Sequence, residues 1–472
     1  MRLETITLKN FRCYDDLTIE LHPQLTVLVA NNGGGKTTLL DGLRIGLWPF
    51  VSSFDLARTK FADPANAISI DDIRLLSSGR EMARQLPSSV ILTGDYGVGQ
   101  RTWERYRDNE VSGSHIREDA EVRELKAFAA DLQTRVRNLE QDPVSLPVFG
   151  YYGTGRLYDE KRLTKGKKPT SHSDALSEGI RTFAYLDCLD PASSYKRFEA
   201  WFVSVFLQWR ESQIRSQERP GRSSDIDDGI LSAIRVVQGA VDIMLRPMGW
   251  HTLEYSETYD KSLILYHEQQ GVLKVSQLSD GVKNMLAMVA DIAYRCALLN
   301  GHLGQWAAVS TEGIVMIDEV DMHLHPSWQQ TVLGSLTKAF PNIQFIVTTH
   351  SPQVLSTVPA ECIRSLETEV DADSHAVRMV VTTPTVQTQG IPSTDILATI
   401  QHVDPVPDVQ PAHWLSEYKA LIQQYKHDSD AGIKLRQKLD KHFGKEHPVM
   451  LECERLIRLM AMKKKLPTMK VN

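Results

Sequence analysis

The sequence predicts an α/β fold with a mixed sheet, a helical insertion and a helical C-terminal domain. An apolar run at 25–29 precedes a glycine-rich loop and a segment with helical character at 38–47. Two more apolar runs, at 313–317 and 344–348, are short and nearly continuous, as in parallel strands that are buried on both faces. A helical pattern at 327–340 lies between them, so strands and helices are expected to alternate around one sheet.

Size and composition limit the class of protein. The 472 residues suffice for two or three structural units, and 42% hydrophobic with 24% charged residues is typical of a globular protein in water. The net charge of −6 does not by itself favour nucleic-acid binding. The five cysteines show no CxxC spacing, the N-terminus lacks a signal-peptide core, and the densest apolar run, 201–207, is too short to cross a bilayer. We therefore expect a cytoplasmic protein without a membrane partner.

The character of the sequence changes along the chain and indicates four parts. Strand patterns at 1–30, 88–106 and 146–152 give way to helical spacing after residue 160, return after 250 and are lost after 380. Pro49 is expected to end the helix after the glycine-rich loop. The expected parts are an N-terminal core segment at 1–159, a helical insertion at 160–250, a second core segment at 251–380 and a helical domain at 381–472.

The glycine-rich loop reads Ala30-Asn31-Asn32-Gly33-Gly34-Gly35-Lys36-Thr37-Thr38. A strand, a glycine loop that ends in Lys-Thr and a helix form the context of a phosphate-binding P-loop, although an ordinary glycine-rich turn is the alternative. Lys36 would supply a cation for the β- and γ-phosphates, and the Thr37 hydroxyl can hold Mg²⁺. Ala30 stands where such loops usually have their first glycine, which is tolerable if its φ is negative. The expected nucleotide-binding residues here are Asn32, Gly33, Gly35, Lys36, Thr37 and Thr38.

Polar residues follow the two later apolar strands. Asp318 directly follows the strand at 313–317 and can reach Mg²⁺, directly or through water, while Glu319 is placed to orient or deprotonate an attacking water. His350 ends the next strand, where an imidazole can hydrogen-bond a γ-phosphate and sense its loss. A solvated acidic strand end and a structural histidine are the respective alternatives.

A helix start provides a second candidate for anion binding. Ser279 and Gly281 lie just before the helical pattern at 285–299, and the N-terminus of a helix attracts anions. Taken alone, Ser-Asp-Gly is also a routine N-cap. Its position shortly before the strand that leads to Asp318 and Glu319 favours the interpretation as an anion site.

These elements, in this order, resemble the ABC-type ATPases of the RecF and SMC group over about 1–160 and 250–365. The resemblance implies a P-loop NTPase of ABC type that binds ATP and Mg²⁺ between two heads. It also implies that Arg12, in Asn10-Phe11-Arg12, is a candidate nucleotide contact. The residues that would act within one subunit are Lys36, Thr37, Asp318, Glu319 and His350. Ser279 and Gly281 would complete the site of a second subunit.

Four blocks resemble a narrower group. They lie at 146–156, 318–326, 387–390 and 444–448, and they look like blocks of the PtuA-type ATPase subunits of Septu and retron-associated anti-phage defence systems. This resemblance implies a sensor or regulator subunit in a homo-oligomer built from head-to-tail dimers. It also implies an HNH nuclease as a separate partner, and nucleic acid, either DNA or retron RNA/DNA, as a candidate ligand.

Some features leave alternatives open. ABC-type ATPases usually carry a glutamine in the Q-loop, but no clear Q-loop glutamine follows the strand at 146–152. ATP hydrolysis could therefore be slow. The same difference argues against an ABC transport ATPase. A RecF-like DNA-repair ATPase that binds DNA directly is the main alternative. For nucleic-acid contact the best candidate is an exposed basic cluster, formed by Lys161, Arg162, Lys165, Lys167 and Lys168.

Overall fold

The computed structural model describes residues 1–57, 64–78, 81–111, 116–138, 140–155, 179–191, 195–218, 225–370 and 377–465. The chain divides into two compact units, Met1–Ile396 and Leu397–Asn472, and each is described by itself. The basic cluster at 161–168 and Arg156, the last residue of the block at 146–156, lie outside the described residues. The division into four parts that the sequence suggests stays a prediction.

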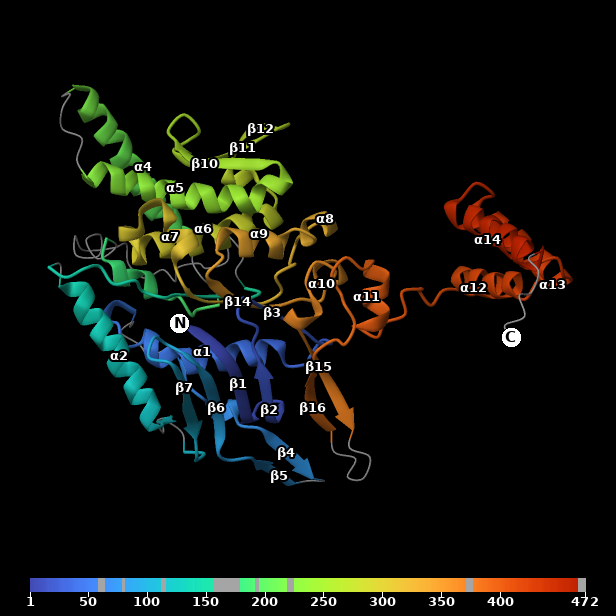
Figure 1. Ribbon diagram of the computed structural model, residues 1–472, viewed down its shortest axis with the longest axis horizontal. Coiled ribbons are helices and arrows are strands. Elements are labelled where there is room, and N and C mark those ends of the chain that lie inside the picture. The colour runs from blue at the N-terminus through green and yellow to red at the C-terminus, as the bar shows by residue number, and fades with distance from the viewer. Residues whose placement is uncertain are drawn as a thin grey trace, which may run out of the picture. The chain divides into compact units, whose positions relative to one another are not determined.

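A six-stranded mixed sheet carries the candidate site (Figure 1). Its strands, in spatial order, are β16 (Val377–Thr382), β15 (Ile363–Val370), β3 (Leu25–Val29), β14 (Ile343–Thr348), β13 (Gly313–Ile317) and β9 (Val148–Tyr152). The five strands from β15 to β9 are parallel, and β16 is antiparallel to β15. Every residue of β3, β9, β13 and β14 is buried, as the continuous apolar runs predicted.

A second sheet is antiparallel and precedes the insertion. It contains, in spatial order, β2 (Tyr14–Glu20), β1 (Arg2–Phe11), β6 (Ser88–Asp95), β7 (Gln100–Arg107) and β8 (Arg117–Glu118). The smaller sheets are the pair β4 (Leu75–Ser78) and β5 (Glu81–Arg84), and the three strands β10 (Trp250–Ser256), β11 (Ser262–His267) and β12 (Gly271–Lys274). These elements confirm the strands predicted at 1–30 and 88–106 and the return of strand pattern after residue 250.

Helices surround the sheets of the first unit. They are α1 (Lys36–Val51), α2 (Ala120–Arg137), α4 (Tyr195–Glu218), α5 (Asp225–Leu245), α6 (Asp280–Leu299), α7 (Ala307–Ser310), α8 (Pro326–Gln329), α9 (Val332–Ala339) and α10 (Pro352–Leu355), with α11 (Ser393–Thr399) at the boundary of the units. The single helix expected at 327–340 is divided into two short helices, α8 and α9, with a turn at Gln330 and Thr331 between them.

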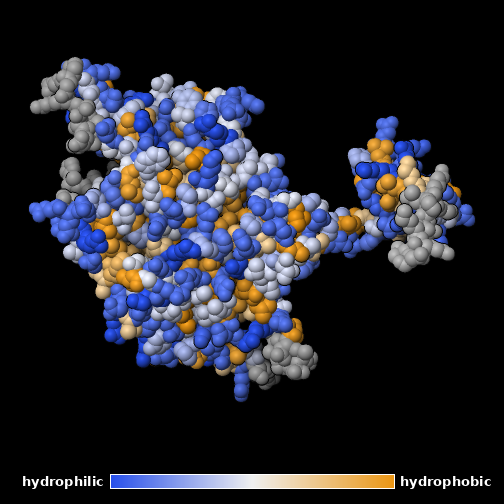
Figure 2. All heavy atoms as spheres, viewed as in Figure 1, coloured by the Kyte–Doolittle hydropathy of each residue, from blue (hydrophilic) through white to orange (hydrophobic). Residues whose placement is uncertain are grey.

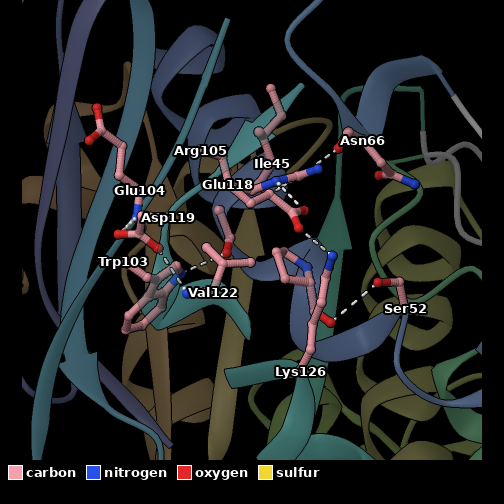
Figure 3. Close-up of polar contacts among 12 residues, drawn as sticks. Ile45, Ser52, Asn66, Trp103, Glu104, Arg105, Glu118, Asp119, Val122 and Lys126 are labelled. Carbon is pink, nitrogen blue, oxygen red and sulfur yellow. Dashed lines mark hydrogen bonds and ion pairs between the residues drawn. The ribbon is translucent and has the colours of Figure 1, made fainter. Parts of the chain in front are cut away.

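Helix α1 does not end at Pro49, contrary to the sequence prediction, but continues to Val51. Proline has no N–H, so the carbonyl of Ile45 lacks its usual helical donor. The Arg105 guanidinium, from β7, donates to that carbonyl at 2.6 Å and also to Asn66 O at 2.8 Å (Figure 3). Burial lowers the pKa of Arg105 to about 10. A side chain from another element thus replaces the missing hydrogen bond.

A buried charged network joins α6 to the edge strand β9. The Asp291 carboxylate accepts hydrogen bonds from Tyr152 OH and from Arg295 Nε, both at 2.8 Å. Arg295 also donates to the backbone carbonyls of Ala184 and Leu186. Asp291 is 3% and Arg295 4% exposed, and burial raises the pKa of Tyr152 well above its ordinary value, with Asp291 adding to the effect. The network therefore holds three separate segments together in the interior.

The second unit is a small helical bundle. Its helices are α12 (Gln410–Gln423), α13 (Asp430–Phe443) and α14 (Pro448–Lys465), which agrees with the loss of strand pattern after residue 380. Its core consists of Tyr418, Ile422, Leu435, Leu439, Met450 and Cys453. With the helical insertion segments α4 and α5, this bundle confirms the predicted fold class. Among the described helices, none has the length and apolarity needed to cross a bilayer. Figure 2 shows a visible face on which hydrophilic residues predominate and apolar ones are scattered.

We expect Asp291→Ala to destabilise the first unit by about 3–5 kcal/mol, because the buried Arg295 charge would lose its carboxylate. Urea unfolding monitored by circular dichroism measures this change. Glu211→Ala is the control, since Glu211 pairs with Arg215 on an exposed helix face, and should change stability by about 0.5 kcal/mol or less. Equal effects of the two substitutions would contradict the role given to the network.

Candidate nucleotide-binding site

The glycine-rich loop connects β3 to α1 and requires glycine at two positions for backbone reasons. Gly33 has φ +80° and Gly35 has φ +82°, in the left-handed region. A Cβ on Gly35 would also lie 2.2 Å from Tyr14 OH and 2.9 Å from Cys13 Sγ, whereas a Cβ on Gly33 would meet nothing within 4 Å. Ala30 is not among the non-glycine residues with positive φ. Alanine in place of the first glycine therefore causes no such backbone strain.

The Lys36 side chain folds back over its own loop. Its Nζ donates to Ala30 O at 2.9 Å and to Asn31 O at 3.4 Å, and the residue is 7% exposed. Burial lowers the pKa of Lys36, while the carboxylates of Asp318 and Glu319 oppose that shift. The ammonium is thus held within the loop whose amides would face a phosphate, as expected of a P-loop lysine.

A hydrogen bond joins the end of the glycine-rich loop to the residue that follows β13. Thr37 Oγ1 donates to Asp318 Oδ2 at 2.8 Å, across 281 residues of sequence. Asp318 is 3% exposed. A hydroxyl and a carboxylate at this distance supply the oxygen ligands that Mg²⁺ prefers, and phosphate oxygens and water commonly complete such a site. No group of three or more His, Cys, Asp or Glu side chains in the described ranges is arranged to hold a metal ion. Mg²⁺ binding by Thr37 and Asp318 stays a prediction.

Thr348 completes the cluster and was not predicted. It is the last residue of β14, and its hydroxyl donates to Asp318 Oδ1 at 2.6 Å and accepts from Glu319 N at 2.7 Å. Glu319 has φ +48°, a left-handed conformation that is uncommon outside glycine. A polar residue after the apolar run Phe345 to Val347 was the sequence signal for Thr348.

His350 lies two residues beyond β14 and is half-buried. Burial lowers the pKa of His350 below its ordinary value, and Lys36 lowers it further, although Asp321 and Glu319 oppose the shift. His350 follows β14, whose neighbours in the sheet are β3, which leads into the P-loop, and β13, which leads into the Asp318–Glu319 pair. The depressed pKa favours a neutral imidazole at neutral pH.

The other two predicted residues, Ser279 and Gly281, lie at the start of α6. Ser279 is the N-cap of α6, and its hydroxyl makes no capping hydrogen bond to the helix. A Cβ on Gly281 would lie 2.4 Å from His323 O, so only glycine allows this close contact with the loop after Glu319. Within the described chain, no hydrogen bond or ion pair joins Ser279 or Gly281 to residues 30–38. Their action in a second subunit's site stays a prediction.

Arg12 lies in a carboxylate network. Its Nε donates to Asp72 Oδ1 at 2.7 Å and its Nη1 to Asp41 Oδ2 at 2.6 Å. Asp41 belongs to α1 and also accepts from Tyr151 OH at 3.2 Å. The backbone of Arg12 is left-handed, at φ +50°. A nucleotide contact by Arg12 stays a prediction, and no sequence pattern pointed to either aspartate.

Substitutions in the loop test this geometry. Lys36→Ala should abolish ATP binding, and so should Gly35→Ala, because the new methyl group must displace the Tyr14 ring. Gly33→Ala has nearly the same φ but open space around it, so we expect a much smaller loss. Isothermal titration calorimetry with ATP and Mg²⁺ gives the affinities, and thermal unfolding confirms that each variant folds. Retained affinity in Lys36→Ala would count against the P-loop.

Comparisons with known proteins show which families and proteins the chain resembles. Two family models match the chain: one described as "AAA domain" over residues 5–216, and one described as "AAA domain, putative AbiEii toxin, Type IV TA system" over residues 170–356. The two matches together span both halves of the candidate site.

Several curated proteins are similar to the chain. The "Retron Ec83 probable ATPase" of Escherichia coli is 28% identical over 511 residues, which cover 96% of this chain and 86% of that protein. The "Retron Vc95 probable ATPase" of Vibrio cholerae is 26% identical over 466 residues, covering 90% and 83%. The "Septu protein PtuA" of Bacillus thuringiensis is 30% identical over 155 residues, covering 32% and 36%. The chain carries, in this order, a P-loop, the Ser279 helix start and the Asp318–Glu319 pair. It has the fold of a P-loop ATPase of ABC type and is similar in sequence to the retron and Septu ATPases.

Proposed function

We propose that the chain binds and hydrolyses ATP with Mg²⁺ between two of its copies, and that this cycle regulates a bacterial anti-phage defence complex. The observation that carries the proposal is the hydrogen bond from Thr37 to Asp318. It joins the end of the phosphate-binding loop to the end of the acidic strand, which is the arrangement that phosphoryl transfer requires.

Each residue has a distinct task in this proposal. Lys36 leaves its loop carbonyls and neutralises the β- and γ-phosphate oxygens. Thr37 and Asp318 hold Mg²⁺, which when bound supplies positive charge against the phosphates. Glu319 orients the attacking water or accepts its proton. His350, neutral because its pKa is depressed, hydrogen-bonds the γ-phosphate and loses that partner after hydrolysis.

The second copy supplies the start of its α6. Ser279, which makes no capping bond to its helix, and the backbone of Gly281 would bind the γ-phosphate held by the first copy. Two such sites form in a head-to-tail dimer, and larger homo-oligomers are built from these dimers. ATP thereby acts as the link between heads.

Similarity to the retron and Septu ATPases supports the role in defence. We infer that the chain works in the cytoplasm beside a separate nuclease subunit of the HNH type. ATP-dependent pairing of heads would report the state of the complex to that subunit. Reconstitution with the product of a neighbouring HNH reading frame tests this partner.

Two substitutions separate binding from hydrolysis and from pairing. Glu319→Gln should keep ATP bound, lower turnover by at least about 100-fold and accumulate paired heads, because the water is no longer activated. Ser279→Arg should leave ATP binding by one copy intact and prevent ATP-dependent pairing, because a bulky cation replaces the small hydroxyl. Phosphate release measures turnover, and light scattering with and without ATP measures pairing.

Specific results would contradict the proposal. Unchanged turnover in Glu319→Gln would remove Glu319 from its task. Normal ATP-dependent assembly of Ser279→Arg would refute the contribution in trans. The double variant controls for both effects: it should bind ATP, stay unpaired and not hydrolyse.

A second candidate function, direct binding of DNA by a RecF-like ATPase, has one observation in its favour. Residues 397–472 contain 13 Lys and Arg against nine Asp and Glu, although the whole chain has net charge −6. On α13, Lys434, Lys438 and Lys441 are exposed at intervals of four and three residues, so they share one helix face. Lys438 Nζ also lies 5.2 Å from the centre of the Trp414 ring. Such a basic face with an aromatic neighbour suits a phosphate backbone.

A salt titration tests this candidate. If the three lysines contact duplex phosphates, Lys→Glu changes at all three should reduce the slope of log affinity against log salt by about 0.9 per lysine. Fluorescence anisotropy of the full chain with labelled duplex gives the slopes. Lys338→Glu, an exposed lysine of α9, should leave the slope unchanged. A slope that does not respond to the triple change would exclude this face.

A further inference from the structure

Thr348 is fully buried at the carboxyl end of β14, between the two acidic residues of the site. Its exposed fraction is 0%. The single hydroxyl hydrogen is donated to Asp318 Oδ1 at 2.6 Å, and a lone pair of the same oxygen accepts Glu319 N at 2.7 Å. One side chain therefore fixes both the carboxylate that fits Mg²⁺ and the backbone of the residue proposed to act on water.

The backbone around Glu319 depends on the same residue. Along a strand, successive N–H groups point to opposite neighbours. Asp318 N accordingly donates to Tyr152 O on β9 at 2.8 Å, and Glu319 N points the other way, to Thr348. Val320 N should point back to β9, but it donates to Thr348 O at 3.0 Å. The left-handed φ of Glu319, +48°, makes this turn, and two bonds to Thr348 hold it.

The neighbouring threonine performs a similar task farther from the proposed chemistry. Thr349 Oγ1 donates to Asp321, and Thr349 also accepts from Ser351 N at 2.9 Å. The loop after β13 is therefore attached to the end of β14 by two consecutive hydroxyl groups. Of the two, Thr348 is the one whose hydroxyl hydrogen-bonds Asp318 and the backbone of Glu319.

Residue shape alone does not require a hydroxyl at this position. The strand before it, Ile343 to Val347, is buried throughout, and valine would occupy nearly the same volume as threonine. Burying a hydroxyl costs free energy unless it is hydrogen-bonded. The hydroxyl of Thr348 is bonded twice, and both partners belong to the acidic pair.

We infer that Thr348 is a positioning residue for ATP hydrolysis: it holds the Asp318 carboxylate in place and sets the direction in which the Glu319 side chain leaves the backbone. This inference rests on the proposed hydrolytic function and adds to it a residue that itself touches neither water nor phosphate. Misplacement of a catalytic group by about 1 Å is enough to lower a rate about 100-fold.

Steady-state kinetics of the full chain test the inference. Thr348→Val removes the hydroxyl and should lower kcat by roughly 10- to 100-fold, while the affinity for ATP, set mainly by Lys36 and its loop, changes by less than about threefold. Thr348→Ser keeps the hydroxyl and should retain most of the turnover. Thr26→Val is the matched control, because Thr26 is also 0% exposed and its hydroxyl accepts a bond from His22 N at 2.9 Å. It should leave kcat unchanged.

A double-mutant cycle identifies the group through which Thr348 acts. In a Glu319→Gln background, Thr348→Val should reduce the residual single-turnover rate by less than about threefold, because its target is already disabled. Penalties that multiply would overturn the part of the inference that concerns Glu319. A wild-type kcat in Thr348→Val, or a Thr348→Ser variant as slow as Thr348→Val, would overturn the inference as a whole.

Two further measurements keep failures distinguishable. Thermal unfolding shows whether Thr348→Val folds. If it does not, Thr348→Cys, with a weaker donor of similar size, replaces it and should lower kcat several-fold, with an unchanged kcat overturning the inference. Turnover by the wild-type chain tests the proposed function itself, so its absence would remove hydrolysis and the role of Thr348 together, whereas turnover without a Thr348→Val effect would remove only the latter.

Discussion

The parallel alignment of β3, β14 and β13 is the constraint on which the site depends. In these three neighbouring strands, Leu28 is paired with Thr348, and Val347 with Ile317. Their carboxyl ends therefore lie at one edge of the sheet, where ligands of open α/β sheets bind. Residues 36–37, 318–319 and 348–350 meet there only because this register is kept. The burial of all three strands on both faces makes a slip of one residue costly.

Sequence patterns could predict the parts of this structure that depend on local chemistry. Continuous apolar runs identified the buried strands, and the glycine loop ending in Lys36-Thr37 identified the candidate phosphate site, because both depend on residues close in sequence. The sequence could not show that Arg105 replaces the donor missing at Pro49, since these residues meet only in the folded chain. For the same reason, the sequence could not predict that Thr348 hydrogen-bonds the Asp318–Glu319 pair, or that Arg12 hydrogen-bonds Asp41 and Asp72.

The first described segment of the insertion is part of the core rather than an addition to its surface. β9 is the last strand of the six-stranded sheet, and its outer edge is met by two backbone bonds, from Tyr151 N to Cys188 O at 2.9 Å and from Gly153 N to Pro191 O at 2.8 Å. An edge strand left open invites pairing with another chain. Covering it protects the strand whose carbonyl at Tyr152 receives Asp318 N.

The close contact between Gly281 and the His323 carbonyl links the start of α6 to the loop that follows Glu319. The helix start sits directly on the loop that follows Glu319, with no side chain between them to absorb a displacement. In the proposed dimer, the start of α6 in one copy binds the nucleotide held by the other copy. A displacement of this helix start would be passed directly to the loop beside Asp318 and Glu319 of the same copy. Hydrolysis in the two sites of the dimer would then be coupled, because glycine at position 281 leaves no side chain between the helix start and this loop.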